Sequence, residues 1–369
     1  MQTRSFVLPG EPVDEALDGP RTLVLAFGDP ALTPDGEALS ALRAAFGRSV
    51  VIGCSASGQL LDDALVDDGL VALAVRFDHT DLHLARTTID GIDDSRAAGQ
   101  RLAEQLPPDG LAGVLLLCDG LDVNGTDVVE GLTAGLSRPV PISGGLASDH
   151  ARFEHTWVLA GDALGGGLVG AVGLYGDRVR ITHGCRGGWE PFGPARRVTR
   201  SDGNRLFELD GRPALALYRS YLGVYADGLP GSALLFPLAI QTPDRPAPVV
   251  RTVLAVDEDT QSMTFAGDLP EGATAQLMRA THDLLVDGAV AAARDCGVAD
   301  VGSAVAFAVS CVGRRLVFGE RAEEEVEAVR AVLGAVPLVG FYSNCEVSPG
   351  TGFSELHNQT MTLALLAEV

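Results

Sequence analysis

One pattern recurs three times along the chain and constrains the fold more than any other feature. Each copy is an apolar strand, a short amphipathic helix, a second apolar strand and a polar segment that begins with glycine. The copies cover residues 23–58, 114–149 and 304–346, and their polar segments read GCSASG, SGGLASD and GFYSNCE. This alternation is typical of strand-helix-strand units, which normally form right-handed parallel crossovers.

The glycines of these polar segments are spaced alike in the three copies. In two copies 26 positions separate the end of the first strand from the glycine, and in the third copy 30 positions do so. We therefore predict that Gly53, Gly144 and Gly340 occupy equivalent strand ends. Three glycine-led turns at the ends of buried strands would line a pocket, so the pattern indicates ligand binding before catalysis.

The composition excludes several classes of function. At 369 residues with 46% hydrophobic content, the chain is expected to form two globular domains. Its net charge of −22 repels phosphate, which disfavours nucleic acid and membrane partners. All 27 basic residues are arginine, so Schiff-base, Walker and kinase lysines are excluded. Because no apolar run approaches the roughly 18 residues of a membrane span and no signal peptide is evident, we expect a cytoplasmic protein.

The six cysteines show no C-x-x-C spacing. Without an export signal they are expected to be free, reduced thiols. We predict neither a metal site nor a cofactor.

The order of the segments predicts an α+β or α/β fold. We expect two related domains of mixed β-sheet packed by helices, and a layered α-β-β-α sandwich would accommodate them. A leader covers residues 1–20, the N-terminal domain 21–210 and the C-terminal domain 211–369. Two strand-like runs at 70–77 and 82–88 flank a polar tetrapeptide and predict a β-hairpin.

The first glycine-led segment contains a candidate nucleophile. Gly53 frees the backbone for a sharp turn, where Cys54 or Ser55 could act if a base lay beside it. No spacing singles out one of the seven histidines as that base. Cys54 is therefore open to three interpretations: a small buried residue, a ligand contact or a catalytic thiol.

The second segment could hold a zwitterion. Backbone N–H groups at Gly144 and Gly145 would bind a carboxylate, and Asp149 would pair with an ammonium group. The alternative is a plain glycine turn.

The densest polar cluster follows the last repeat. We predict a ligand pocket beside this cluster, because several kinds of hydrogen-bonding group converge at the end of a buried strand. The alternative is a hydrogen-bonded loop that holds the C-terminal strand. The candidate residues are Tyr342, Asn344, Glu346, His357 and Asn358.

These motifs resemble those of FIST proteins, whose name stands for F-box and intracellular signal transduction. The likeness covers nearly the whole chain, with the N-domain at about 20–210 and the C-domain beyond it. One position departs from the family, because Cys345 stands where glycine usually precedes the glutamate. The motifs that carry the likeness are GCSASG, ISGGLASD, GFYSNCE followed by ELHNQT, and LDGRPALALYRSYLG at the join.

The resemblance implies a sensory module that binds a small ligand, with amino acids as candidates. We expect such a chain to signal through a separate partner protein. Two other classes remain open: a hydrolase with Cys54 or Ser55 as its nucleophile, and a structural interaction module without a ligand. A ligand screen separates the sensor from the structural module, because a ligand stabilises the fold that binds it.

Overall fold

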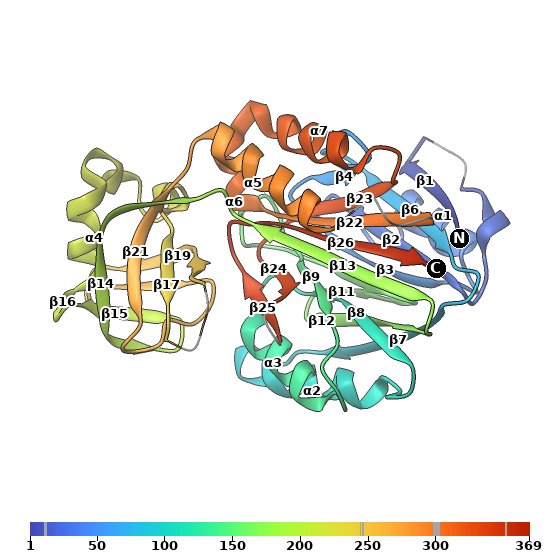
Figure 1. Ribbon diagram of the computed structural model, residues 1–369, viewed down its shortest axis with the longest axis horizontal. Helices are drawn as coiled ribbons and strands as arrows, with labels where there is room; N and C mark the ends of the chain where they lie inside the picture. Colours follow the sequence, from blue (N-terminus) through green and yellow to red (C-terminus); the bar gives the residue numbers. More distant parts are fainter. Residues whose placement is uncertain (11–12, 244, 246, 298–302, 351–352) are drawn as a thin grey trace.

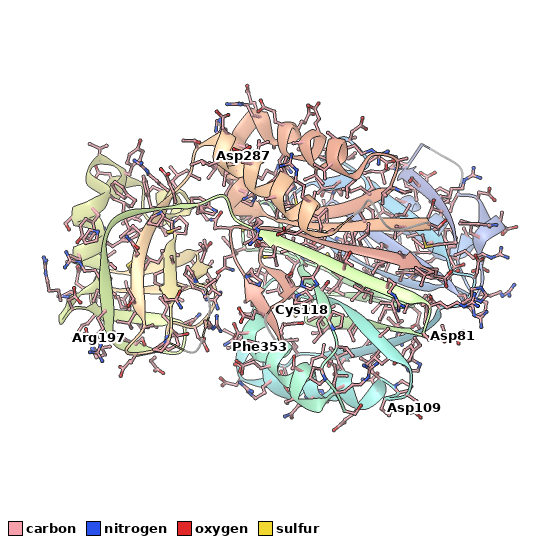
Figure 2. The ribbon with its side chains drawn as sticks, in the orientation of Figure 1. Asp81, Asp109, Cys118, Arg197, Asp287 and Phe353 are labelled. Carbon is pink, nitrogen blue, oxygen red and sulfur yellow. The ribbon has the colours of Figure 1, made fainter. Side chains whose placement is uncertain are left out.

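The computed structural model describes every residue except 11–12, 244, 246, 298–302 and 351–352 (Figure 1). The protein is a mixed α+β structure with two domains. A layered domain consists of residues 1–189 and 280–369. A curled half-barrel sheet, formed by residues 190–279, is inserted into it and lies at one end of the molecule, where Figure 2 labels Arg197.

The described strands of the layered domain form three sheets of six strands each. The first sheet has the order β1-β6-β2-β3-β10-β11, with β1 Gln2–Leu8, β2 Thr22–Gly28, β3 Val50–Ser55, β6 Leu70–Arg76, β10 Val158–Ala160 and β11 Ala163–Gly165. The second has the order β25-β24-β9-β8-β12-β7, with β7 Asp81–Thr88, β8 Leu111–Cys118, β9 Ile142–Leu146, β12 Leu168–Tyr175, β24 Glu346–Pro349 and β25 Ser354–His357. The third has the order β13-β26-β22-β23-β4-β5, with β4 Gln59–Leu61, β5 Ala64–Val66, β13 Val179–Arg186, β22 Ser303–Cys311, β23 Leu338–Ser343 and β26 Met361–Glu368.

The three sheets share one plan. The parallel strand pair of one repeat lies at the centre of each sheet: β2–β3, β8–β9 or β22–β23. A later strand of the same repeat, β6, β12 or β26, pairs antiparallel with the first strand of that pair. A hairpin from a different repeat extends the second strand: β10–β11, β24–β25 and β4–β5 join the first, second and third sheets. The repeats are therefore interlocked in a ring.

The three predicted glycines occupy equivalent positions, which confirms the duplication. They lie inside the second strand of each parallel pair rather than in a turn after it. A Cβ atom at any of them would overlap a carbonyl oxygen of the paired strand, so the close approach of two backbones requires glycine. The pairs are Gly53 with Ala26, Gly144 with Leu116, and Gly340 with Ala308.

Helices cover the outer faces of the sheets, and one hydrophobic core fills the space between them. In this core Phe27 stacks on Phe341 and Phe307, with ring centroids 4.6 and 5.8 Å apart. The helices are α1 Glu37–Ala45 on the first sheet, α2 Ser95–Gln105 and α3 Gly125–Gly135 on the second, and α5 His282–Asp295 and α7 Ala322–Leu333 on the third. The third sheet with α5 and α7 and the second sheet with α2 and α3 form the predicted α-β-β-α layers (Figure 1). The first sheet packs against the same core.

The predicted hairpin at 70–77 and 82–88 is wrong. Both runs are strands, but β6 pairs with β1 and β2 in the first sheet, whereas β7 pairs with β12 in the second. The polar tetrapeptide crosses between the sheets, and the Glu368 carboxylate accepts hydrogen bonds from the backbone N–H groups of residues 78–80. Local alternation identifies a strand but not its partner.

The half-barrel is built mainly from antiparallel strands around α4 (Ala214–Leu222) and its own core. The predicted boundary near residue 210 falls between β15 and β16, which pair with each other. The boundary divides the sequence but does not separate two folded units, because the second and third sheets combine strands from both sides of it. The strands are β14 Glu190–Asp202, β15 Arg205–Leu209, β16 Arg212–Pro213, β17 Leu238–Gln241, β18 Val249–Arg251, β19 Val253–Asp257, β20 Ser262–Phe265 and β21 Thr274–Arg279.

One further helix, α6 (Val312–Phe318), follows β22 and lies near the junction of the two domains (Figure 1). Across the described residues, no helix combines the length and the apolar character that crossing a membrane would require.

Candidate functional site

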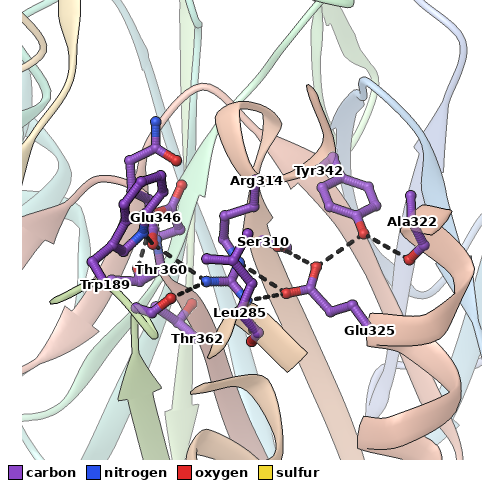
Figure 3. A network of polar contacts seen from close by, with 12 residues as sticks. Trp189, Leu285, Ser310, Arg314, Ala322, Glu325, Tyr342, Glu346, Thr360 and Thr362 are labelled. Carbon is purple, nitrogen blue, oxygen red and sulfur yellow. Dashed lines mark hydrogen bonds and ion pairs between the residues drawn. The ribbon is translucent and has the colours of Figure 1, made fainter. Parts of the chain in front are cut away.

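Tyr342, the first residue of the predicted C-terminal cluster, is buried beneath α7 (Figure 3). Its hydroxyl donates a hydrogen bond to Glu325 Oε2 at 2.9 Å. Burial raises the pKa of the tyrosine well above its usual value, and the nearby Glu325 carboxylate raises it further. Tyr342 is therefore a neutral donor within a protein network.

Arg314 of α6 is the centre of that network (Figure 3). It is fully buried and forms an ion pair with Glu325, which is fully buried too. The guanidinium also donates to the carbonyl oxygens of Gly187 and, at 2.8 Å, Leu285. Gly187 lies where the chain leaves for the half-barrel, and Leu285 lies in the first turn after it returns. Arg314 of the third repeat is thus bonded to both chain crossings, that is, to the two segments that connect the layered domain with the half-barrel.

Glu346 is enclosed by donors from its own domain. Its carboxylate accepts hydrogen bonds from Ser343 Oγ at 2.9 Å, Thr360 N at 3.1 Å and Thr360 Oγ1 at 2.9 Å. Burial raises the pKa of Glu346 to about 7, although these hydrogen bonds oppose the shift. The carboxylate joins the end of β23 to the start of β26.

Asn358 links the two domains. Its Oδ1 accepts a hydrogen bond from the backbone N–H of Thr252 at 3.3 Å, and its Nδ2 donates to Cys345 Sγ at 3.1 Å. The neighbouring His357 lines a cavity of about 420 Å³. Burial, followed by the charge of Arg251, lowers the pKa of His357 to about 3, so its imidazole is neutral.

The first glycine-led segment is part of the hydrophobic core. Cys54 is 0% exposed, and burial raises the pKa of its thiol well above the usual value. Ser55 is equally buried, and its Oγ accepts a hydrogen bond from Trp157 N at 3.1 Å. Within the described residues neither side chain has a hydrogen bond to histidine, so this geometry does not support a nucleophile with a base.

The second segment is also engaged internally. Gly144 and Gly145 lie in β9, where they pair with β24. The Asp149 carboxylate accepts hydrogen bonds from the backbone N–H groups of residues 153–155 at 2.7–3.0 Å. Asp149 therefore stabilises the loop after β9. The zwitterion site at Gly144, Gly145 and Asp149 stays a prediction, because in this structure their groups bond to the protein itself.

A cavity of about 310 Å³ lies between the two domains, and we call it the junction cavity. Its layered-domain wall follows the carboxyl ends of β8–β9 and β22–β23, the place where ligands bind in many α/β sheets. Its other wall comes from the half-barrel. The side chains are mostly apolar with a few polar groups, as in small-molecule pockets. The layered domain contributes Gly120–Gly125, Leu146, Cys311–Gly313, Asn344, Cys345 and Leu356 among others, and the half-barrel contributes Asn204, Leu234, Thr252, Leu254 and Thr264–Gly267.

Asn344 is the predicted site residue with the clearest place in this cavity. Its Nδ2 donates to the carbonyl oxygen of Gly120 at 3.3 Å, which fixes the orientation of the amide. Its Oδ1 is enclosed and has no partner among the described residues, and the same holds for Thr252 Oγ1. An enclosed polar atom without a partner costs about 1–3 kcal/mol. Asn344 and Thr252, two residues of the cavity wall, therefore each carry a polar atom whose hydrogen bonding is unsatisfied.

Sequence reasoning missed most of the cavity wall. The half-barrel residues are separated by long stretches of other structure, so no local spacing connects them with Asn344. One signal was available: the loops after the first strand of the second and third repeats, at 119–124 and 311–313, follow parallel strands in the same way as the glycine-led segments.

In the described part of the chain, no group of three or more His, Cys, Asp or Glu side chains could hold a metal ion. All six cysteines are free, which confirms the prediction of free thiols.

Comparison with known proteins gives relatives of unassigned function. An uncharacterized protein of Mycobacterium bovis, Mb0898c, is 29% identical over 331 residues, which cover 86% of this chain and 76% of the relative. Uncharacterized protein MT0656 of Mycobacterium tuberculosis is 27% identical over 272 residues, covering 69% and 68%. Uncharacterized protein MJ1623 of Methanocaldococcus jannaschii is 25% identical over 190 residues, covering 47% and 35%.

Family comparison covers nearly the whole chain. Residues 22–212 match the FIST N domain and residues 214–349 match the FIST C domain. The chain therefore belongs to the FIST family.

Proposed function

We propose that this chain is a sensory module that binds a small organic molecule in the junction cavity and signals through a separate partner protein. The observation that carries the proposal is a mostly apolar cavity whose wall is shared by two domains. Membership of the FIST family, whose domains are known as sensory modules for small ligands, supports the same function. Amino acids and their amine and amide derivatives are the compounds to screen first.

The position of the cavity suits a sensor. A ligand there touches both domains, so it binds best in one relative position of the two and stabilises that position. Gly313 lines the cavity and Arg314, the next residue, holds both chain crossings. Movement at the cavity wall would thus reach the segments that set the position of the half-barrel. We propose that a partner protein in the cytoplasm recognises the change.

A thermal-shift screen over amino acids and related amines and amides tests this function. A ligand at about 100 times its dissociation constant should stabilise the protein by roughly 2.7 kcal/mol. Thr264→Trp, which fills the cavity from the half-barrel side, should abolish the shift. Val224→Trp is the matched control, because Val224 is 85% exposed and outside the described cavity wall. Ligand shifts that survive Thr264→Trp would contradict the proposed site.

A further inference from the structure

The charge of the junction cavity limits what its ligand can carry. Of the described residues that line the cavity, Asp122 alone has a charged side chain. Asp268 is the next residue after Gly267, which lines the wall. Burial is the main cause that raises the pKa of Asp268, and the charge of Asp127 raises it further. The cavity thus lies in acidic surroundings, in a protein of net charge −22. A carboxylate placed in this apolar space would lose its hydration without gaining a cation.

Arg251 is the buried cation nearest in kind to a partner for such a carboxylate. Its hydrogen bonds hold it outside the set of residues that line the cavity. It is 2% exposed and does not line the cavity. Its Nη1 donates to the carbonyl oxygen of Leu356 at 3.0 Å, and its Nε contacts that of Asp268 at 3.4 Å. A Cβ atom on Gly267 would meet the Arg251 guanidinium, which places Gly267 against it.

One unpartnered atom of the wall, Asn344 Oδ1, prefers a ligand that donates a hydrogen bond, whereas the hydroxyl of Thr252 can donate or accept. Asn344 Oδ1 is an acceptor only, and its amide is oriented by the bond from Nδ2 to Gly120. An ammonium or amide group of a ligand would supply the missing donor. The rim of the cavity is apolar, with Ile92 55%, Phe153 49% and Leu254 39% exposed, so the rest of the ligand is expected to be hydrocarbon.

We propose that the junction cavity binds small apolar amines and rejects the free amino acids of the same shape. This inference rests on the proposed function, because it concerns the ligand of the same site. The selectivity comes from the missing cation and the enclosed Asn344 acceptor. A primary amide in place of the carboxylate should restore binding, because the amide removes the negative charge but keeps the shape.

Titration calorimetry on the full chain tests the selectivity with matched probes. Isoamylamine, leucinamide and leucine share one side chain, and phenethylamine and phenylalanine form a second matched set. We expect each amine to bind at least tenfold more tightly than its amino acid, with leucinamide between isoamylamine and leucine. Asn344→Ala should weaken amine binding several-fold, whereas Arg251→Gln and Arg251→Lys should leave it unchanged.

The outcomes separate the two claims. If leucine binds as tightly as isoamylamine, or if leucine binding is lost in both Arg251 variants, the selectivity is wrong. If that leucine binding is still blocked by Thr264→Trp, the proposed function survives. If none of the five probes binds the folded chain, the selectivity is wrong, and a screen without any ligand then counts against the proposed function itself. Circular dichroism on every variant shows first that it is folded.

Discussion

At the scale of single residues, the polar groups of the C-terminal cluster hold the fold together. Tyr342 pairs with Glu325, and Glu346 pairs with Ser343 and Thr360. The sequence could predict that these groups converge after a buried strand, because the motif is local. It could not predict which protein groups satisfy them, because Glu325 lies on α7 and Thr360 lies just before β26, both remote from Tyr342 and Glu346 along the chain.

The raised pKa of Glu346 predicts a pH dependence. Its pKa is about 7 in the folded protein and near its usual 4.5 in the unfolded chain. Between these values the folded state binds more protons, so the contribution of Glu346 to stability falls as pH rises from about 4.5 to 7. Glu346→Gln removes this term. In urea titrations, the free energy of unfolding of the wild type minus that of the variant should therefore decrease across that window. A difference that does not change with pH would show that the pKa of Glu346 is not raised.

The equivalent glycines give a second prediction at this scale. Gly144→Ala should cost about 3 kcal/mol or more, because its Cβ would overlap the Leu116 carbonyl oxygen. Gly231→Ala is the control, since a Cβ there meets no atom within 4 Å, and it should change stability by less than about 0.5 kcal/mol. Chemical denaturation measures both. Equal effects would contradict the close approach.

At the scale of elements, the repeats were predictable and their exchange of hairpins was not. Strand and helix periodicity identified all three strand-helix-strand units, because each unit is continuous in sequence. The hairpin β10–β11 pairs with β3 of another repeat, and β24–β25 pairs with β9, which no local pattern encodes. The wrong hairpin at 70–88 has the same cause, since neighbouring strands belong to different sheets.

The buried Arg314–Glu325 ion pair is expected to stabilise the protein and to hold the two segments that lead into and out of the half-barrel. Arg314→Met should destabilise the protein by about 3–5 kcal/mol, because it leaves Glu325 buried without its partner. The exposed pair Arg321–Glu324 is the control, and Arg321→Ala should destabilise the protein far less.

Hydrogen exchange separates this holding role from simple stability. Arg314→Met should speed exchange at 187–190 and 280–285 more than in the core strand β22, because Arg314 holds those crossings. Uniformly faster exchange over the whole chain would show that Arg314 acts on global stability alone.

At the scale of the whole molecule, the half-barrel is an insertion between two neighbouring points of the layered domain. Gly188 packs against the backbone of Leu284 and Leu285, so the ends of the insertion lie close together. Replacing residues 190–279 with a short Gly-Ser linker should leave a layered domain that unfolds cooperatively. It should no longer respond to ligands, because one wall of the cavity is gone. Thermal unfolding with and without ligand measures both properties, and a retained ligand shift would contradict a shared site.

In the proposed function both domains hold the ligand in the junction cavity. Thermal shift with the strongest ligand of the screen tests it most directly, using one cavity-filling variant from each wall: Val123→Trp in the layered domain and Thr264→Trp in the half-barrel. Each cavity-filling variant should fold and lose the shift, while Val224→Trp, which is exposed and outside the cavity wall, should keep it. A full ligand shift in either cavity-filling variant would contradict a site shared by the two domains.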